Sequence, residues 1–517
     1  MLALQWAAVT RVLPLARSRL ARPASTSAFD TAIHNFGADL RQRQPTFSIP
    51  TNGIQILSQP SEFYALILDM IQRAQNRIFL SSLYIGSGQT ELIASLSSAL
   101  QRKPALQLHL QLDLNRSTRP GSASTARLLL PLLRAFPQRV HVHLFRSPSL
   151  RGLLAKVVPP RFNEGWGTWH AKIYGADDDV LISGANLNES YFSNRQDRYI
   201  YFSKQKQLAN YCFQFLKVVS TCAYMLSPAE DMNPSDSTPY SYRQEDYIVH
   251  WPDPDTHPHN FNEKLHKALS TFQESHRQSS SFSSSPGDVT LFPIVQGGQF
   301  GIREEETAIE LLFKHLRSIS QVSHPFMDLT SGYFNLYRPY QNLLLTSPGV
   351  DVRVLAASPK ANGFYGSKGI SSRIPEGYTI LERRFIQAVD RAGRSWQEGA
   401  STGIQLNEWE KEGWTYHAKG LWLSPTAATN PILTLFGSTN LNARSAHIDT
   451  ELSFLMLLQP PNESEGYDAA ADSTMSLGCQ LADEIRTIRS HAYEWSGYQR
   501  AIRPGTRTML RIVEDML

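Results

Sequence analysis

Two histidine–lysine pairs are the residues of this sequence with the clearest chemical potential. His170 and Lys172 stand two positions apart in WHAKIYGADDDV, and His417 and Lys419 stand two apart in YHAKGLWL. If each pair lies on a strand, alternation places its histidine and its lysine on one face. A histidine can attack phosphorus or donate a proton near neutral pH, and a lysine can hold phosphate oxygens as a point charge. Both pairs are therefore suited to phosphodiester transfer.

A glycine–asparagine turn and a carboxylate follow each pair at one spacing. From Asn186 to Asp197 is 11 positions, and from Asn440 to Glu451 is also 11. We expect each carboxylate to accept a hydrogen bond from Nδ1 of its own repeat's histidine, which leaves Nε2 facing phosphorus. Asp197 could instead be an exposed acid, because arginines flank it on both sides. The amides expected to bind phosphate oxygens are Asn186, Asn188, Asn440 and Asn442.

The elements that must position these residues also occur twice. A helix around residues 63–71 precedes an apolar run at 78–85, and a helix around 309–316 precedes Ser331–Phe334. Strands with period-2 alternation follow at 106–114 and 350–355. From Tyr84 to His170 is 86 positions, and from Tyr333 to His417 is 84. This repetition predicts an α/β protein with two pseudo-twofold lobes, each a mixed β-sheet flanked by helices, and one phosphate site between them.

Composition changes suggest the boundaries of these units. We expect a presequence at 1–29, a first repeat at 30–250, a linker at 251–288 and a second repeat at 289–517. The linker is proline-rich at 252–258 and serine-rich at 279–285, with a short helix expected around 261–272. The segment 459–465 is expected to be a surface insertion.

The first 29 residues have the composition of a mitochondrial transit peptide, with four arginines and no acid. Without them, the formal charge of +4 falls to near zero. A near-neutral body argues against a general nucleic-acid binder. The sequence contains no apolar stretch of membrane-spanning length, so any membrane contact is expected to be peripheral. The three cysteines form no metal-binding motif, and the acids at 177–179 are expected to be a solvated loop, so we expect no metal and no cofactor.

The first histidine–lysine pair and its surroundings resemble a motif of a known superfamily. His170-x-Lys172-x4-Asp177 matches the HKD motif of the phospholipase D superfamily, and the likeness extends over residues 50–515. The second copy departs from the motif, because Ser424 stands where aspartate is expected. The resemblance implies that the catalytic residues are His170, Lys172, Asp177, His417 and Lys419. In that superfamily the aspartate looks more structural than chemical, so we expect Ser424 not to take part in the reaction.

Within the superfamily, the stretch from Leu144 to Phe202 is similar to eukaryotic mitochondrial phosphatidylglycerophosphate synthases. This resemblance implies transfer of a phosphatidyl group from CDP-diacylglycerol to glycerol 3-phosphate, with release of CMP. It also implies peripheral contact with the mitochondrial inner membrane on its matrix side. The alternatives are another phosphatidyltransferase that makes phosphatidylserine or cardiolipin, a phosphodiesterase that uses water, and a lipid-binding protein without catalysis.

Several basic residues could bind the substrates or an anionic lipid surface. The segment 150–162 mixes apolar and basic side chains, and it could either dock on lipid or pack as an ordinary loop. Arginines elsewhere could hold glycerol 3-phosphate or the cytidine diphosphate, although surface solvation is the default for each. The candidates are Arg116, Arg119, Lys156, Arg161 and Arg444.

Overall fold

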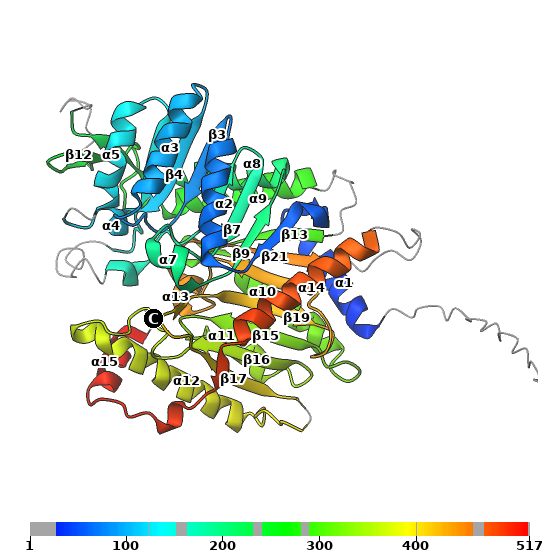
Figure 1. Ribbon diagram of the computed structural model, residues 1–517. Coiled ribbons are helices and arrows are strands. Elements are labelled where there is room, and N and C mark those ends of the chain that lie inside the picture. Colours follow the sequence, from blue (N-terminus) through cyan, green and yellow to red (C-terminus); the bar gives the residue numbers. More distant parts are fainter. Residues whose placement is uncertain are drawn as a thin grey trace, which may run out of the picture.

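The computed structural model describes residues 27–121, 124–150, 163–230, 240–280, 289–399, 401–458 and 470–514. Two ten-stranded mixed sheets form two lobes that lie against each other (Figure 1). The strand order of the first sheet is β11 (Tyr242–Arg243), β12 (Tyr247–His250), β10 (Tyr224–Pro228), β5 (Val140–Phe145), β4 (Gln107–Asp113), β3 (Arg77–Ser81), β6 (Ile173–Ala176), β7 (Asp179–Ser183), β9 (Tyr199–Phe202) and β2 (Ile54–Leu57).

The second sheet repeats the part of this order from β10 to β2, in the reverse direction, as β13 to β22. Its strands are β1 (Phe47–Ile49), β13 (Val289–Gly297), β21 (Glu451–Leu458), β20 (Leu433–Gly437), β19 (Lys419–Ser424), β15 (Phe326–Ser331), β16 (Asp351–Ala357), β17 (Ile404–Trp409) and β22 (Ala492–Glu494), with β14 (Ile302–Arg303) on β13. In both sheets three consecutive strands, β3–β4–β5 and β15–β16–β17, pair in parallel, while the strands that follow each histidine pair antiparallel. The predicted two-lobed α/β fold is confirmed.

Helices flank both sheets. Those before and between the first-lobe strands are α2 (Pro60–Arg73), α3 (Thr90–Arg102), α4 (Leu114–Ser117), α5 (Thr125–Ala135), α7 (Glu189–Ser193), α8 (Lys206–Ser220) and α9 (Asn262–Ser280). The remaining helices are α1 (Ala28–Arg41), α10 (Glu304–Ser318), α11 (Arg338–Leu345), α12 (Ile374–Arg391), α13 (Ala443–His447), α14 (Ala470–Arg489) and α15 (Thr506–Val513). Short 3₁₀ turns are η1 (Thr51–Gly53), η2 (Asn163–Trp166), η4 (Gly298–Phe300), η5 (Gly369–Arg373) and η6 (Gly497–Gln499).

Local sequence explains the elements that were predicted. Helix α2 begins with a capping box between Gln59 and Glu62 and has proline in its first turn, and its apolar face at 3.6-residue spacing is buried. The alternating run at 106–114 forms β4 at the centre of the first sheet, and the run at 350–355 forms most of β16. No helix among the described residues is long and apolar enough to cross a membrane.

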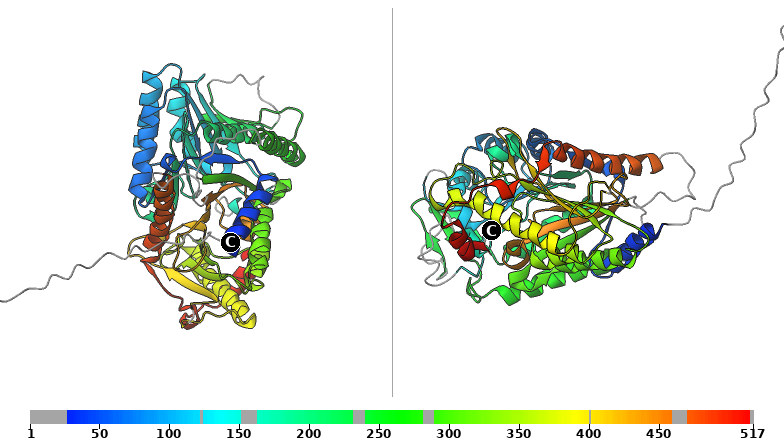
Figure 2. Two further views of the ribbon diagram at one scale, coloured as in Figure 1. Left: turned by 90° about the vertical axis from the view of Figure 1, so that its right-hand side faces the viewer. Right: turned by 90° about the horizontal axis from the view of Figure 1, so that it is seen from below.

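Segments near the two ends of the chain pack against the lobe of the other repeat, which the sequence did not indicate. Helix α1 packs on α10, and β1 pairs with β13 of the second sheet (Figure 2). In the other direction, α14 contacts β2 and η1 of the first lobe. The predicted linker contains the 19-residue helix α9, longer than expected, which packs on α8. The segment around 28–49, counted with the first repeat or presequence by composition, therefore lies with the second lobe.

A buried ion pair helps to join the lobes. Arg198, at the start of β9, donates to both carboxylate oxygens of Glu484 on α14 at 2.9 Å, and its guanidinium lies 3.8 Å from the ring centre of Trp422. Both charged side chains are almost fully buried. Removing one partner of such a pair would leave an uncompensated charge in the core, which is strongly destabilising.

Candidate active site

A cavity of about 630 Å³ lies between the two lobes and contains both predicted histidines. Its walls come from both repeats, and they combine histidine, amide, tyrosine and arginine side chains. The lining residues are Leu83, Tyr84, Arg116, Arg119, Pro120, His170, Asn186, Asn188, Ser190, Tyr191, Arg195, Tyr333, Gly363, Phe364, Ser367, Tyr378, His417, Asn440, Asn442 and Arg444.

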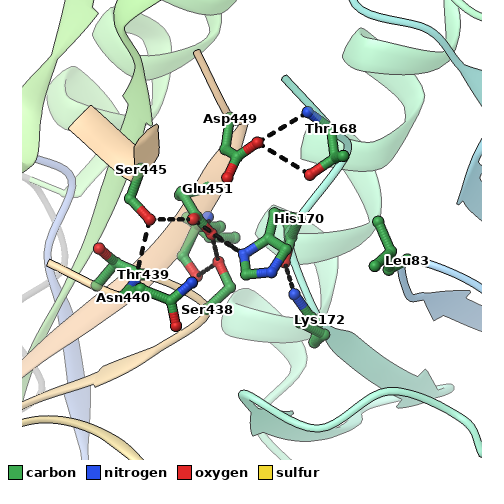
Figure 3. Close-up of polar contacts among 12 residues, drawn as sticks. Leu83, Thr168, His170, Lys172, Ser438, Thr439, Asn440, Ser445, Asp449 and Glu451 are labelled. Carbon is green, nitrogen blue, oxygen red and sulfur yellow. Dashed lines mark hydrogen bonds and ion pairs between the residues drawn. The ribbon is translucent and has the colours of Figure 1, made fainter. Parts of the chain in front are cut away.

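His170 approaches the cavity on a backbone segment that runs beside the other lobe. Trp169 and Thr450 form a parallel bridge, and the His170 backbone N–H donates to the Thr450 carbonyl at 2.9 Å. This pairing brings the carboxylate of Glu451 to the imidazole, where both oxygens lie 2.9 Å from Nδ1 (Figure 3). The pairing fixes the ring so that Nε2 is the nitrogen left for the cavity.

His417 is held in the same way by the first lobe. Strand β18 (Thr415–Tyr416) pairs in parallel with β8 (Arg195–Gln196), and the His417 backbone N–H donates to the Gln196 carbonyl at 2.8 Å. His417 Nδ1 lies 2.6 Å from the carboxylate of Asp197.

The prediction that each carboxylate orients its own repeat's histidine is therefore wrong. Glu451 of the second repeat contacts His170 of the first, and Asp197 of the first contacts His417 of the second. The cause is the parallel pairing across the lobes, which sequence spacing within one repeat cannot reveal. The exposed-acid alternative for Asp197 is also wrong, since this side chain is buried.

The two lysines lie beneath the histidines. Lys172 Nζ donates to the carbonyl of His170 at 2.6 Å, and Lys419 Nζ donates to the carbonyl of His417 at 2.7 Å. Lys419 Nζ also lies 3.5 Å from a carboxylate oxygen of Asp197. Both lysines are fully buried. Two lysine side chains thus lie beneath the histidine pair, each held by the carbonyl of the histidine two positions before it.

Burial and charge set the ionisation of the site. Burial opposes a charge on Glu451, but the neighbouring His170 and Lys172 outweigh it and lower the pKa of Glu451 to about 2. Burial lowers the pKa of His170 even though Glu451 opposes the change. Burial and the Lys419 ammonium together lower the pKa of His417 well below its usual value. The carboxylates are charged, and burial disfavours the protonated form of each imidazole; where Nδ1 faces a carboxylate, that nitrogen carries the ring proton.

Two serines complete the surroundings of Glu451. Ser438 donates to one carboxylate oxygen at 2.5 Å and Ser445 donates to the other at 2.7 Å (Figure 3). Sequence reasoning missed both. The repeat gave no signal for Ser445, because the equivalent position of the first repeat, five after Asn186, holds Tyr191.

The position equivalent to Ser445 is used differently in the first repeat. The Tyr191 hydroxyl lies 3.4 Å from Nε2 of His417 and accepts from the amide of Asn186 at 3.1 Å. Arg195 stacks over the Tyr191 ring at 4.5 Å and also lines the cavity. Neither Tyr191 nor Arg195 was among the predicted site residues.

All four predicted asparagines line the cavity, but their amides are held differently. The side-chain oxygen Oδ1 of Asn186 accepts from the backbone N–H of Leu83 at 3.2 Å. Asn442 instead caps helix α13, because its Oδ1 accepts from the Ser445 N–H at 2.9 Å. The buried amide oxygen of Asn440 has no hydrogen-bond partner among the described residues. The Asn440 amide is thus the one least committed to the protein.

Three of the five predicted substrate-binding cations line the cavity. Arg116 stacks over Tyr84 at 4.4 Å, and Arg444 donates to Asp449 at 2.7 Å. Arg119 is the third of them. Lys156 and Arg161 lie outside the described residues.

Asp177 lies apart from the cavity, and its assignment to the catalytic set is corrected. It occupies the two-residue turn between β6 and β7, with φ of 50°, at the far end of β6 from His170. Its carboxylate accepts from the backbone N–H groups of Gln75, Asn76 and Arg77 at 2.6, 2.8 and 3.0 Å. Aspartate tolerates this left-handed conformation and holds the start of β3, so its role is structural.

The second repeat does not need that aspartate. Ser424 ends β19 opposite Phe326, again at the end of the strand remote from the histidine. The connection from β19 to β20 spans 425–432, so a tight two-residue turn is not required there.

Three donor atoms of His170, Asp449 and Glu451 lie within 4.8 Å of one another, a spacing that a metal ion could use. Their oxygens are engaged by the protein. Asp449 accepts from the backbone N–H and hydroxyl of Thr168 and from Arg444, while Glu451 accepts from two serines and His170. Hydrogen bonds therefore account for this cluster of acids.

The fold and the paired histidines define a chain of two α/β repeats, each of which brings one carboxylate-bound histidine to a shared cavity. Among solved structures the chain is similar to phosphatidylserine synthase from Haemophilus influenzae, with a TM-score of 0.65 at 20% identity, covering 93% of this chain and 98% of that one. At that identity the likeness concerns the fold alone. No protein-family model matches the chain.

Curated relatives place the chain more narrowly. It is 36% identical over 485 residues to the CDP-diacylglycerol–glycerol-3-phosphate 3-phosphatidyltransferase of Schizosaccharomyces pombe, covering 86% of this chain and 90% of the relative. It is 34% identical over 447 residues to the human mitochondrial protein of that name, covering 83% and 78%. A probable enzyme of the same name from Dictyostelium discoideum is 35% identical, covering 83% and 73%. The chain belongs to the CDP-diacylglycerol–glycerol-3-phosphate 3-phosphatidyltransferase family.

Proposed function

We propose that this chain transfers the phosphatidyl group of CDP-diacylglycerol to glycerol 3-phosphate, giving phosphatidylglycerophosphate and CMP, through a phosphatidyl-histidine at His170. Family membership supports the reaction. The observation that carries the mechanism is that two histidines, each with Nδ1 held by a carboxylate, line one cavity from opposite lobes. In-line displacement needs groups on opposite sides of one phosphorus, and this arrangement supplies them.

In the first step, Nε2 of His170 attacks the phosphorus of the phosphatidyl group. The phosphorus–oxygen bond to CMP breaks, its electron pair leaves with CMP, and His417 supplies a proton to that oxygen. The negative charge of the bound diphosphate favours the protonated form of His417, which burial and the Lys419 side chain otherwise disfavour. The lysines and the cavity amides stabilise charge on the phosphate oxygens.

In the second step, neutral His417 takes the proton from a hydroxyl of glycerol 3-phosphate. The hydroxyl oxygen attacks phosphorus, and the bond from phosphorus to His170 breaks with its electron pair returning to Nε2. Two displacements in succession invert the phosphorus twice, so the scheme predicts net retention of configuration.

The hydrogen bonds of the two histidines support His170 as the nucleophile. Tyr191 lies within hydrogen-bonding distance of Nε2 of His417, whereas no described side chain does so for Nε2 of His170. A nucleophile needs an unobstructed nitrogen, and an acid–base group can share its proton with a hydroxyl. Glu451, with two serine donors, keeps its charge beside a histidine that becomes positively charged in the adduct.

The test offers purified chain CDP-diacylglycerol together with glycerol 3-phosphate, serine, phosphatidylglycerol or water, and identifies the product. Phosphatidylglycerophosphate is expected with glycerol 3-phosphate. Labelled CMP should also exchange into CDP-diacylglycerol without any acceptor. Phosphatidylserine, cardiolipin or phosphatidate as the main product would support one of the alternatives, and inversion at phosphorus would exclude the covalent intermediate.

We further propose that the chain works on the matrix side of the mitochondrial inner membrane, brought there by residues 1–29. The names of the human and mouse relatives include the mitochondrion, which supports the organelle. Residues 1–26 lie outside the described residues, and α1 begins at Ala28 with Ser27 as its cap. Deleting residues 1–26 should abolish import of a reporter fusion and leave activity in detergent intact. Continued import would contradict this assignment.

A further inference from the structure

One wall of the catalytic cavity carries an exposed apolar and basic surface on its outer side. The loop 363–373 lines the cavity with Phe364 and Ser367, and it turns Tyr365 and Ile370 outward. The exposed fractions of these two side chains are 60% and 53%, and both stand on one loop, so together they form a small exposed apolar patch. We call the exposed side chains of this loop and of the adjoining α15 the mouth surface: Tyr365, Lys368, Ile370, Arg507 and Arg511.

The loop is held firmly from beneath. Asn362 accepts from the backbone N–H of Phe364 at 2.9 Å, and its carbonyl accepts from Tyr365 N–H at 2.9 Å. Phe364 packs on a small buried cluster that includes Tyr378 of α12 and Leu510 of α15. Tyr365 and Ile370 are therefore presented by an ordered loop that leaves them out of the core.

Two arginines tie the loop to α15, so the two segments make one surface. Arg373 donates to the Pro504 carbonyl at 2.6 Å, and Arg503 donates to the Ser372 carbonyl at 2.7 Å. Helix α15 lies beside α12, at the same end of the second lobe (Figure 1).

The charge of this surface has one sign. Its charged members are three cations, while the neighbouring acids Glu376 and Glu514 are paired with Arg503 and Arg384. Lys368, Arg507 and Arg511 are exposed, and none of them forms an ion pair with another described residue. Arg507 and Arg511 are four residues apart, so they share one face of α15. An anionic partner would meet these three charges without first breaking an ion pair.

We propose that the mouth surface docks on an anionic phospholipid bilayer, with Tyr365 and Ile370 entering the headgroup region and the three cations resting on it. Exposed apolar side chains ringed by basic ones are what a peripheral protein uses to bind such a surface. This inference rests on the proposed function, because a diacylglycerol-bearing donor lies in a membrane. Docking by this face would open the cavity onto the plane of the lipid headgroups, so the diphosphate could reach His170 while the acyl chains stay in the bilayer.

The test measures vesicle binding by the full chain with no substrate present. Vesicles of phosphatidylcholine alone are compared with vesicles of phosphatidylcholine and phosphatidylglycerol by co-sedimentation. The chain should prefer the anionic vesicles. Tyr365→Ser with Ile370→Ser should lower that binding by about tenfold or more. Lys368→Ser with Arg507→Ser should lower it by about tenfold, and high salt should remove the difference.

Val322 provides the matched control. Its side chain is 73% exposed, and it precedes β15 at the end of that strand remote from the cavity. Val322→Ser should leave vesicle binding unchanged. Equal binding by wild type and the Tyr365/Ile370 variant, or equal loss in Val322→Ser, would overturn the proposal. A change in the variant's oligomeric state with vesicle binding retained would show instead that the surface contacts another copy of the chain.

Turnover of detergent-dispersed CDP-diacylglycerol separates this proposal from the proposed function. The Tyr365/Ile370 variant should keep this turnover within about twofold while losing activity on vesicles, because interfacial binding is what it lacks. If wild type binds vesicles through this surface but makes no phosphatidylglycerophosphate in detergent, the proposed function fails and the docking surface stands.

Discussion

Each histidine and the groups around it form one half of the site, which we call a half-site. The two half-sites have the same backbone arrangement but differ in the side chains around the histidine. Each imidazole donates from Nδ1 to a carboxylate of the other repeat. Around Glu451 the other donors are two serine hydroxyls, whereas around Asp197 they are the Arg198 backbone N–H and, at longer range, the Lys419 ammonium. A duplicated fold thus supplies the geometry twice, and a few side chains make the two histidines unequal.

One pair of equivalent positions shows how this difference arises. Gly184 and Ser438 occupy the same place in the two turns. A side-chain carbon at Gly184 would lie 2.6 Å from both Lys419 Nζ and an Asp197 oxygen, so the lysine takes the space that the Ser438 side chain fills in the other half-site. The first repeat's turn accommodates an ammonium group and the second repeat's turn supplies a hydroxyl.

The largest expected difference between the half-sites concerns the histidines themselves. His170→Ala should abolish both turnover and CMP exchange, because no adduct can form. His417→Ala should reduce turnover by ~10²–10⁴, as for loss of a general acid–base group, and still form some adduct. Acid-labile phosphatidyl label on His170 in the His417→Ala protein would confirm the assignment. Label on His417 in the His170→Ala protein would reverse it.

Substituting either carboxylate should have the next largest effect on turnover, and Glu451→Gln should also change the pH profile. Glu451→Gln and Asp197→Asn keep the shape but lose the charge that fixes the tautomer, so each should cost ~10²–10⁴ in kcat. The charge of Glu451 raises the pKa of His170 against the lowering by burial. Without it that pKa falls further, so His170 stays neutral to lower pH and the acid limb of kcat/KM should move down in Glu451→Gln. An upward shift would contradict the pairing across the repeats.

The fold could be predicted well from the sequence because the repeat is visible in local sequence patterns. Helix periodicity, strand alternation and matched spacing are properties of one segment at a time, and they located α2, β4, α10 and β16. The histidine pairs were found for the same reason. The partners of the histidines were assigned to the wrong repeat, because Trp169–Thr450 and Tyr416–Gln196 pairing joins residues more than 200 positions apart. Tyr191 and Ser445 were missed because equal positions carry different residues.

Substitutions at the equivalent turn positions Gly184 and Ser438 should have a smaller effect. Gly184→Ala should displace Lys419 beside His417, which is the acid of the first step and the base of the second, so it should slow both CMP exchange and transfer to glycerol 3-phosphate. Ser438→Ala should remove a hydrogen bond to the buried carboxylate that holds His170, about 1.5–3 kcal/mol, and should also slow both steps. Single-turnover measurements of both steps would check this. Unchanged rates of both steps in Gly184→Ala would contradict the importance given to the position of Lys419.

The smallest effect on catalysis is expected where the two repeats differ most plainly in motif. Ser424 stands at the position of Asp177, and both lie at the strand ends remote from the histidines. Ser424→Ala should therefore leave kcat and KM within about twofold, like most substitutions away from a reacting group. Asp177→Asn is the matched change in the first repeat. It weakens an acceptor of three backbone N–H groups, so it should lower the free energy of unfolding by about 1–3 kcal/mol while the folded enzyme keeps its kcat. Thermal unfolding and initial rates at a temperature where both variants are folded would separate stability from chemistry. A loss of kcat in Ser424→Ala comparable with that of His417→Ala would show that the second repeat's departure from the motif is part of the reaction after all.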